Sequence, residues 1–327
     1  MAAMTTMVGA RPAYRTLGTP RIRAIARAVL GAGILVAIVL EVGAEPFVRG
    51  IASLTPAGAA AALLLGAAVT AAAAWRWRVL AGRLGLALGW GASVSSYYRS
   101  QFLNAVLPGG VVGDIHRAVS HGRSVRQPAQ ASRAVVAERT AGQAVQLVLA
   151  AVVLVSLGSS AYAPAVGIVL LALAVACVGL VVAARASAHA RRTMTRELVT
   201  LRFAFGTIGI VVEVLVASTI VIAGLVAMFL VACLAVGVDA SPDRLIAVAL
   251  IAVLAGSIPL NIGGWGPREG AAAWAFAATG LGTGAGIAAS TAFGVLAMIA
   301  VVPGAAVVAA SALRRRRGVM QGKEASS

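Results

Sequence analysis

Long apolar runs alternate with short polar connections along most of this sequence. A helix needs about 20 residues to cross the hydrocarbon core of a bilayer, and six of the runs meet that length. They lie near residues 24–43, 56–79, 133–157, 162–184, 207–237 and 284–311. We therefore predict an all-α integral membrane protein in which these runs form full transmembrane helices.

Two further apolar runs are interrupted by glycine and proline. Residues 84–120 contain LPGGVVGD, and residues 244–282 contain PLNIGGWGP. Both residue types break helices, so each run is expected to form two half-helices that meet at a break. Each run is either a re-entrant hairpin or a pair of short full crossings, and the second alternative gives eight to ten spans with the same loop charges.

Arginine positions set the predicted orientation, because positive loops remain in the cytoplasm. Arginine clusters precede the first and third spans, follow the second and last spans, and separate the fourth span from the fifth. The opposite loops, 41–50, 158–164 and 237–244, hold only two arginines. Both termini are therefore predicted in the cytoplasm. The run 84–120 then enters and leaves on the cytoplasmic face, and 244–282 on the outer face.

This order predicts an internal repeat. A succession of span, span, hairpin and span occurs at 24–157 and again at 162–311. Three crossings in each half make the second half inverted relative to the first. Interrupted helices at matching places in inverted halves indicate a transport site, so we expect a polar cavity where the two breaks meet. The transmembrane domain is predicted at 24–312, between basic cytoplasmic tails at 1–23 and 313–327.

The fifth apolar run is longer than a crossing requires. Residues 203–238 carry no charge except Glu213. A helix of that length spans about 54 Å, against a hydrocarbon core of about 30 Å. The beginning of this segment, RELVTLRFAFGTIG, is an alternative candidate for an amphipathic helix at the interface.

Composition supports a membrane protein and excludes other classes. Hydrophobic residues make up 60% of the 327 residues and charged residues 11%, and the mean hydropathy is +0.95. The net charge of +17 comes almost entirely from arginines in short loops. We therefore expect membrane lipids and anionic headgroups as partners, and no nucleic acid.

No known catalytic or metal motif is present. The two cysteines, Cys177 and Cys233, lie inside apolar runs, and the three histidines lack metal-ligand spacing. Neither a P-loop nor a nucleophile elbow nor an HExxH sequence occurs. We expect no cofactor, no metal site and no catalytic residue.

The first break has the composition of an anion site. Pro108 is expected to end the incoming half-helix, and Gly109, Gly110 and Gly113 let the backbone turn and approach other groups closely. The free N–H groups of the next half-helix, which should start near Val111, then point into the break. Asp114 and Arg117 share a helix face, so with Asn104 they are candidates to hold a phosphate or simply to pair with each other.

The second break repeats this pattern. Pro259 is expected to end a half-helix, and three glycines form the turn: Gly263, Gly264 and Gly266. Pro267 suits the first turn of the outgoing helix. Glu269 favours the helix dipole there, whereas Arg268 does not, so Arg268 is expected to face an anion.

The third span carries a polar stripe. Arg139, Gln143 and Gln146 fall on one helical face, and Glu138 borders it. Ionisable groups inside a membrane cost several kcal/mol unless they are paired or hydrated. Glu138 and Arg139 are therefore either functional or located at the cytoplasmic end, where they would extend to the interface. Glu213 also needs a partner, for which an arginine of the breaks is one candidate.

Three sequences together, FLNAVLPGGVVGDIHRA, VVAERTAG and IPLNIGGWGPREGAAAW, resemble the flippase-like family, the transmembrane region of lysylphosphatidylglycerol synthases. The resemblance covers roughly residues 20–312. It implies that the first motif contributes Asn104, Gly109, Gly110, Gly113, Asp114 and Arg117 to a substrate site. The second and third motifs would contribute Glu138, Arg139, Gly263, Gly264, Gly266, Arg268 and Glu269.

The resemblance implies movement of a phosphate-bearing lipid between leaflets. Better-understood members of the family move aminoacylated phospholipids, and others are associated with polyprenyl-linked sugars. The synthase members also carry a soluble aminoacyl-transfer domain after the membrane region, whereas this sequence ends in RRRRGVMQGKEASS. We therefore do not expect this chain alone to synthesise the lipid, and a separate lipid-modifying enzyme is a candidate partner.

Two alternatives to transport remain open at this point. One is a membrane-embedded enzyme or accessory protein acting on lipid-linked sugar, with Asp114 or Glu269 as acid or base. Against it, no nucleotide-sugar or metal motif is visible. The other is a non-transporting membrane scaffold.

Overall fold

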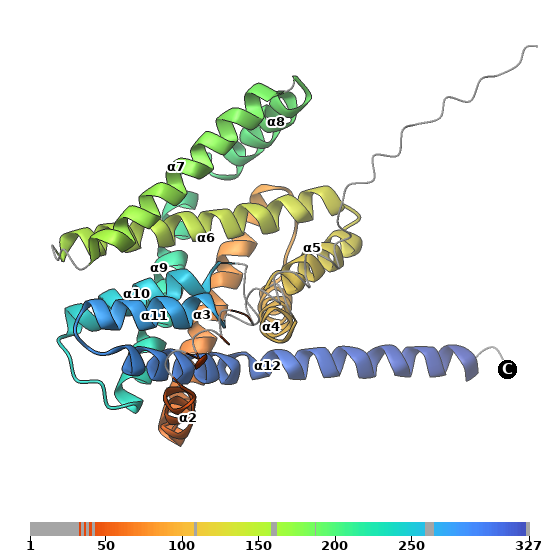
Figure 1. Ribbon diagram of the computed structural model, residues 1–327. Coiled ribbons are helices and arrows are strands. Elements are labelled where there is room, and N and C mark those ends of the chain that lie inside the picture. Colours follow the sequence, from red (N-terminus) through yellow and green to blue (C-terminus); the bar gives the residue numbers. More distant parts are fainter. Residues whose placement is uncertain are drawn as a thin grey trace, which may run out of the picture.

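The computed structural model describes residues 43–107, 110–157, 162–186, 188–258 and 265–324, together with residues 33, 36, 39 and 40. The elements of this part of the chain are helices. In order they are α2 (Glu45–Ala52), α3 (Pro56–Arg83), α4 (Trp90–Val106), α5 (Val112–Ser124), α6 (Pro128–Ser156), α7 (Ala163–Ala186), α8 (Ala188–Ala204), α9 (Ile208–Ala235), α10 (Pro242–Gly256), α11 (Pro267–Ala278) and α12 (Thr283–Glu324). Figure 1 shows α3 and α9 in the body of the molecule, with α12 extending far beyond it.

Four of the described helices are long and apolar enough to cross a bilayer. They are α3, α6, α9 and the Thr283–Ser311 part of α12. Each coincides with one predicted span. The span predicted at 162–184 corresponds to α7, some of whose side chains lie outside the described residues, as does most of the span predicted at 24–43.

The first interrupted run forms two helices separated by a short break. α4 ends at Val106, two residues before Pro108, since the residue before a proline is disfavoured in a helix. α5 starts at Val112, one residue from the predicted position. Gly110 has a φ of +61°, which favours glycine. The second helix also runs further than predicted, to Ser124 rather than residue 120.

The second interrupted run has the same form. α10 ends at Gly256, and α11 begins with Pro267 in its first turn, as predicted. Gly266 precedes that turn with a φ of +106°, where a side chain would be strained. Pro259, Gly263 and Gly264 lie outside the described residues, as do Pro108 and Gly109 in the first break.

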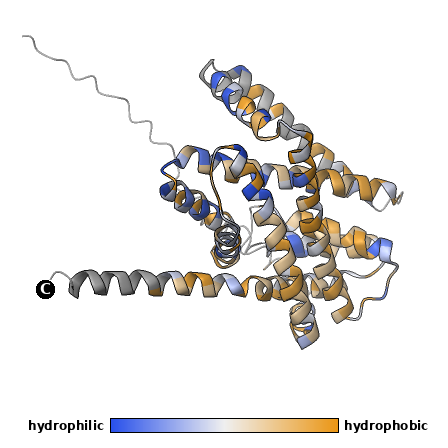
Figure 2. Cartoon of the chain, turned by 180° about the vertical axis from the view of Figure 1, so that it is seen from behind, coloured by the Kyte–Doolittle hydropathy of each residue, from blue (hydrophilic) through white to orange (hydrophobic). Residues whose placement is uncertain are grey.

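The long fifth run is divided into two helices. α8 ends at Ala204 and the apolar helix α9 begins at Ile208, so the charged residues before 204 are not part of the crossing. In Figure 2, the hydrophilic residues of the helix pair α7 and α8 lie mainly on α8, whereas α9 is hydrophobic. Arg133 of α6 holds α8 through Glu197, with N–O distances of 2.6 to 3.1 Å.

Residues 41–50 were predicted as an outer loop, and the structure shows that residues 45–50 of this segment are helical. They belong to α2, which lies against α12. Gly50 permits the contact, since a Cβ at this position would lie 2.4 Å from the carbonyl oxygen of Ala288. The sequence EPFVRG also favours a helix, because proline falls in the first turn and Glu45 pairs with Arg49 four residues later.

The helix contacts occur in matching pairs. α3 packs against α4, α6 and α12, and α9 packs correspondingly against α10, α12 and α6. α5 contacts α4 and α6, as α11 contacts α10 and α12; α4 contacts α12, as α10 contacts α6. α3 and α9 contact each other. This is the set of contacts that a two-fold relation between residues 24–157 and 162–311 requires, although the relation itself stays a prediction.

Glycines let several of these helices approach at backbone distance. A Cβ on Gly304 of α12 would lie 2.3 Å from the carbonyl oxygen of Tyr98 in α4. One on Gly66 of α3 would lie 2.5 Å from the Cβ of Ala300. Small residues at such crossings replace the hydrophobic driving force that is missing between helices in lipid.

We expect Gly304→Ala to destabilise the protein by about 1–3 kcal/mol, because the added methyl group forces α12 away from α4. The measurement is the thermal midpoint of the purified protein in detergent. Gly82→Ala is the matched control, since nothing lies within 4 Å of its Cβ position. Equal midpoints for the two variants would show that α12 does not depend on this close approach.

Candidate functional site

A cavity of about 800 Å³ lies between the two breaks. Gly110 and Val111 line it from the first break, and Gly256 and Ser257 from the second. The remaining lining comes mainly from α4, α5, α6 and α12. The structure thus brings both interrupted runs to one cavity. Its lining is less polar than predicted, because aliphatic residues such as Val135, Val253 and Met298 are interspersed with the polar ones.

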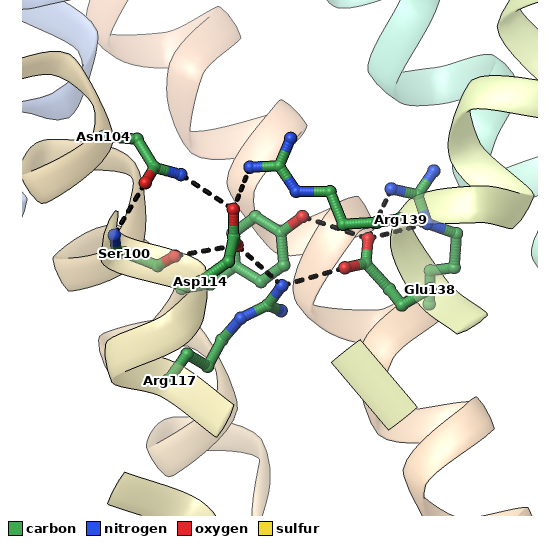
Figure 3. Close-up of polar contacts among 9 residues, drawn as sticks. Ser100, Asn104, Asp114, Arg117, Glu138 and Arg139 are labelled. Carbon is green, nitrogen blue, oxygen red and sulfur yellow. Dashed lines mark hydrogen bonds and ion pairs between the residues drawn. The ribbon is translucent and has the colours of Figure 1, made fainter. Parts of the chain in front are cut away.

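Asp114, in the first turn of α5, is the most heavily hydrogen-bonded residue of the lining (Figure 3). Its Oδ1 accepts from Ser100 Oγ at 3.0 Å and from Arg117 Nη2 at 3.0 Å. Its Oδ2 accepts from Asn104 Nδ2 at 2.9 Å and is also paired with Arg139. A carboxylate offers about four lone-pair sites, so Asp114 is saturated by protein donors.

Asn104 also limits the anion site predicted at the start of α5. Its Oδ1 accepts the backbone N–H of Gly113 at 2.7 Å, which occupies one of the free donors of the helix end. Gly113 itself must be a glycine, because a Cβ there would lie 1.9 Å from the carbonyl oxygen of Ser100. α4 therefore caps α5 and lies against its backbone.

Glu138 is fully buried behind the cavity wall. Its Oε1 accepts from Arg76 Nε at 3.0 Å, from Arg76 Nη2 at 2.5 Å and from the Tyr97 hydroxyl at 3.1 Å. Its Oε2 accepts from Arg117 Nη2 at 2.9 Å. A buried carboxylate stays charged only when it is paired and hydrogen-bonded, as here. Of the two alternatives for Glu138, location at an exposed helix end is therefore wrong.

Arg117 lies between two aromatic rings. Its Cζ is 4.5 Å from the Trp77 ring centroid and 4.3 Å from that of Tyr97. The side chain is fully buried, and its Nε and Nη1 have no hydrogen-bond partner among the residues that the structure describes. Cation–π contacts stabilise a desolvated guanidinium by about 2 kcal/mol. The rings thus hold a positive charge that the carboxylates only partly neutralise.

Arg139 is the cationic side chain of this group that reaches the cavity, with 44% of its side chain exposed. Gln143 and Gln146 follow Arg139 on the same face of α6. All three residues line the cavity, as the predicted polar stripe requires. Gln143 Nε2 donates to Ser257 Oγ at 3.2 Å. α6 therefore connects the cluster at the first break with the second break.

The charges of the cluster do not cancel. Three arginines, Arg76, Arg117 and Arg139, face two carboxylates, Asp114 and Glu138. One positive charge remains in a region of low dielectric constant, where electrostatic interactions are stronger than in water. An anion bound beside Arg139 would complete the balance.

The residues of the second break form a smaller, neutral group. Arg268 donates to Glu269 at 2.5 and 3.0 Å and to Ser290 at 3.0 Å, and Glu269 accepts the N–H of Gly266 at 2.7 Å. Glu269 thus caps the start of α11, where its charge was expected to favour the helix dipole. Arg268 lines the cavity, but two of its nitrogens already donate hydrogen bonds within the protein, and the residue is only 3% exposed. It is less available to an anion than we predicted.

The family of the chain follows from a sequence-wide comparison. The family model described as the lysylphosphatidylglycerol synthase TM region matches residues 24–314. The chain belongs to this family. No curated protein and no solved structure matched it. The membership establishes a membrane protein with helical membrane-spanning segments, and the cavity between the breaks lies within the matched region.

Of the residues that the motifs of this transmembrane-region family suggested, those of the first and second motifs come together. Asn104, Gly110 and Asp114 line the cavity with Arg139, while Gly113, Arg117 and Glu138 lie directly behind it. From the third motif, Arg268 lines the cavity, and Gly266 and Glu269 support it. Gly109, Gly263 and Gly264 lie outside the described residues.

Arg76 was not among the site residues predicted from the sequence. Its position among Arg76, Arg78 and Arg83 indicated a cytoplasmic loop, but Arg76 lies on the buried face of α3 and is 6% exposed. Gly142 leaves room for it, since a Cβ there would lie 2.7 Å from both terminal nitrogens. The available signal was helical phase, because Ala72, Ala73 and Trp77 share its buried face.

Two aromatic residues also bind carboxylates. Tyr97 is buried, and its hydroxyl donates to Glu138. Glu213 accepts from Trp75 Nε1 at 3.1 Å, so the structure gives it this indole as a partner rather than the arginine of the breaks that was one candidate. Ser218 of α9 accepts from Arg76 Nη1 at 2.9 Å and joins the second half to the cluster.

We expect Arg76→Leu to destabilise the protein by about 3–5 kcal/mol, because it leaves the buried Glu138 without its closest partner. Arg78→Leu is the control on the same helix: Arg78 is exposed and donates to the exposed carbonyl of Leu88 at 3.0 Å. Thermal unfolding of both purified variants measures the difference. If Arg76→Leu unfolded at the temperature of the control, the ion-pair cluster would contribute little to stability.

Proposed function

We propose that this protein translocates a phosphate-bearing lipid between the leaflets of the cell membrane, with both termini in the cytoplasm. The observation that carries the proposal is the single cavity that residues of both breaks line, with Arg139 exposed inside it. Non-helical backbone is tolerated at membrane depth where it lines such a cavity.

The mixed lining suits the two parts of a lipid. Arg139 and the amides of α4 and α6 offer donors to a phosphate, and arginine is well suited to bind it. The aliphatic residues of the same cavity accommodate the adjoining hydrocarbon. The net positive charge of the cluster favours an anionic headgroup over a neutral one.

The matching helix contacts support alternating access. If the halves are inverted, the cavity lies at their interface, and an exchange of contacts between the halves would open it first to one leaflet and then to the other. Polar links between the halves, Gln143 with Ser257 and Arg76 with Ser218, are then the hydrogen bonds to be rearranged. Each link is a single hydrogen bond, so rearranging it costs about 1 kcal/mol for the neutral Gln143 link and about 1.5–3 kcal/mol for the charged Arg76 link.

We expect Arg139→Ala to lower the translocation rate of a fluorescent anionic phospholipid by about tenfold or more, because a charge-assisted hydrogen bond to phosphate is lost. The assay measures the loss of fluorescence on adding dithionite to liposomes that contain the purified protein. Arg123→Ala is the control, since Arg123 is exposed near the end of α5 and does not line the cavity.

An Arg139→Ala protein that folds and transports at the wild-type rate would contradict this proposal. The same holds for wild-type protein that leaves the rate of protein-free liposomes unchanged with every phosphate-bearing lipid tested.

A further inference from the structure

The positions of the carboxylates in the chain indicate which charge the bound headgroup can have. The sequence contains ten aspartates and glutamates, and the stretches 108–109 and 259–264, which complete the two breaks, contain none. Glu41 and the side chain of Glu324 lie outside the described residues. Among the carboxylates that the structure describes, Asp114 is the one that lines the cavity.

The other described carboxylates lie elsewhere. Glu138 and Glu269 are fully buried and bound by arginines, and Glu197 and Glu213 have partners on α6 and α3. Glu45 belongs to α2. Asp239 lies in the connection before α10, and Asp243 lies in the first turn of α10. None of these lines the cavity.

Asp114 cannot act as a counter-ion for a ligand in this arrangement. Both of its oxygens already accept two protein donors each, and 10% of its side chain is exposed. A bound ammonium group would have to displace Arg139 or Asn104 from it. Arg139, in contrast, is partly exposed, so a second cation in the cavity is repelled by its charge.

The uncharged polar residues of the lining suit hydroxyl groups. Gln101 comes from α4, Thr140, Gln143 and Gln146 come from α6, and Ser257 comes from the second break. Amides and hydroxyls can both donate and accept, which is what recognition of a polyol requires. The cavity therefore offers a cation for a phosphate and neutral hydrogen-bonding groups for the rest of a headgroup.

We propose that the cavity binds an anionic phosphate lipid whose remaining headgroup is neutral and hydroxyl-bearing, and that it discriminates against the cationic aminoacylated form. This inference rests on the proposed function and names its substrate class. Two sources share this chemistry, a glycerol-bearing phospholipid and a polyprenyl phosphate that carries a sugar.

The test compares lipids that differ only in the headgroup. Purified full-length protein is titrated with dioctanoyl-phosphatidylglycerol and with dioctanoyl-lysylphosphatidylglycerol, and the rise in thermal midpoint gives each affinity. Dioctanoylglycerol controls for the acyl chains, and citronellyl-phosphoryl-glucose represents the polyprenyl source. We expect phosphatidylglycerol or the glucosyl phosphate to bind at about tenfold lower concentration than the lysyl lipid.

A variant provides an independent arm of the test. Gln143→Glu adds a carboxylate to the cavity and loses the bond donated to Ser257 Oγ. The Ser257 hydroxyl, which donates to the Leu254 carbonyl at 2.6 Å, would have to turn from it to donate to the new carboxylate. We expect it to reverse the preference, so that the lysyl lipid binds at least as tightly as phosphatidylglycerol. Gln127→Glu makes the same change at an exposed position before α6 and should leave the preference unchanged.

The outcomes distinguish failure of the headgroup preference from failure of the proposed lipid translocation. Tighter binding of phosphatidylglycerol or of the glucosyl phosphate supports the inference, and the better of the two identifies the source. Equal or tighter binding of the lysyl lipid overturns the inference and leaves lipid translocation intact. If no lipid shifts the midpoint beyond dioctanoylglycerol, the proposed function fails and the inference fails with it.

Discussion

The structure depends on a buried carboxylate shared by helices that are far apart in sequence. Glu138 of α6 binds Arg76 of α3, Arg117 of α5 and the hydroxyl of Tyr97 in α4. Charges of this kind tolerate removal from water only as a complete set. The same set fixes Arg117 next to Asp114 and thereby positions the first break, so stability and the shape of the cavity have a common origin.

The sequence predicted the helices well because glycine, proline and apolar length act locally. The two breaks lie within a few residues of the predicted positions, and four predicted spans coincide with described helices. Errors occurred where tertiary contacts decide. α2 depends on packing against α12, and Arg76 appeared to be a loop arginine because its partners, Glu138 and Ser218, are 62 and 142 residues away.

The site was predictable as a set of residues but not as a set of bonds. The motifs brought together Asp114, Arg117, Glu138 and Arg139, which do form one cluster. Which of them reaches the cavity depends on side-chain direction: Arg139 is exposed, whereas Arg117 is held between Trp77 and Tyr97. Helix-dipole reasoning predicted that Arg268 faces an anion, but its ion pair with Glu269 partly neutralises its charge.

The glycine at 142 has a consequence for how related chains can vary. The guanidinium of Arg76 occupies the space that a side chain at 142 would need, so a larger residue at 142 would require that guanidinium to move. If a related chain with alanine at 142 carried a smaller residue at 76, Glu138 would lose one of its two charge partners and would keep Arg117. We therefore expect residues 76, 138 and 142 to covary among related chains. An alignment would show this covariation whatever the substrate is.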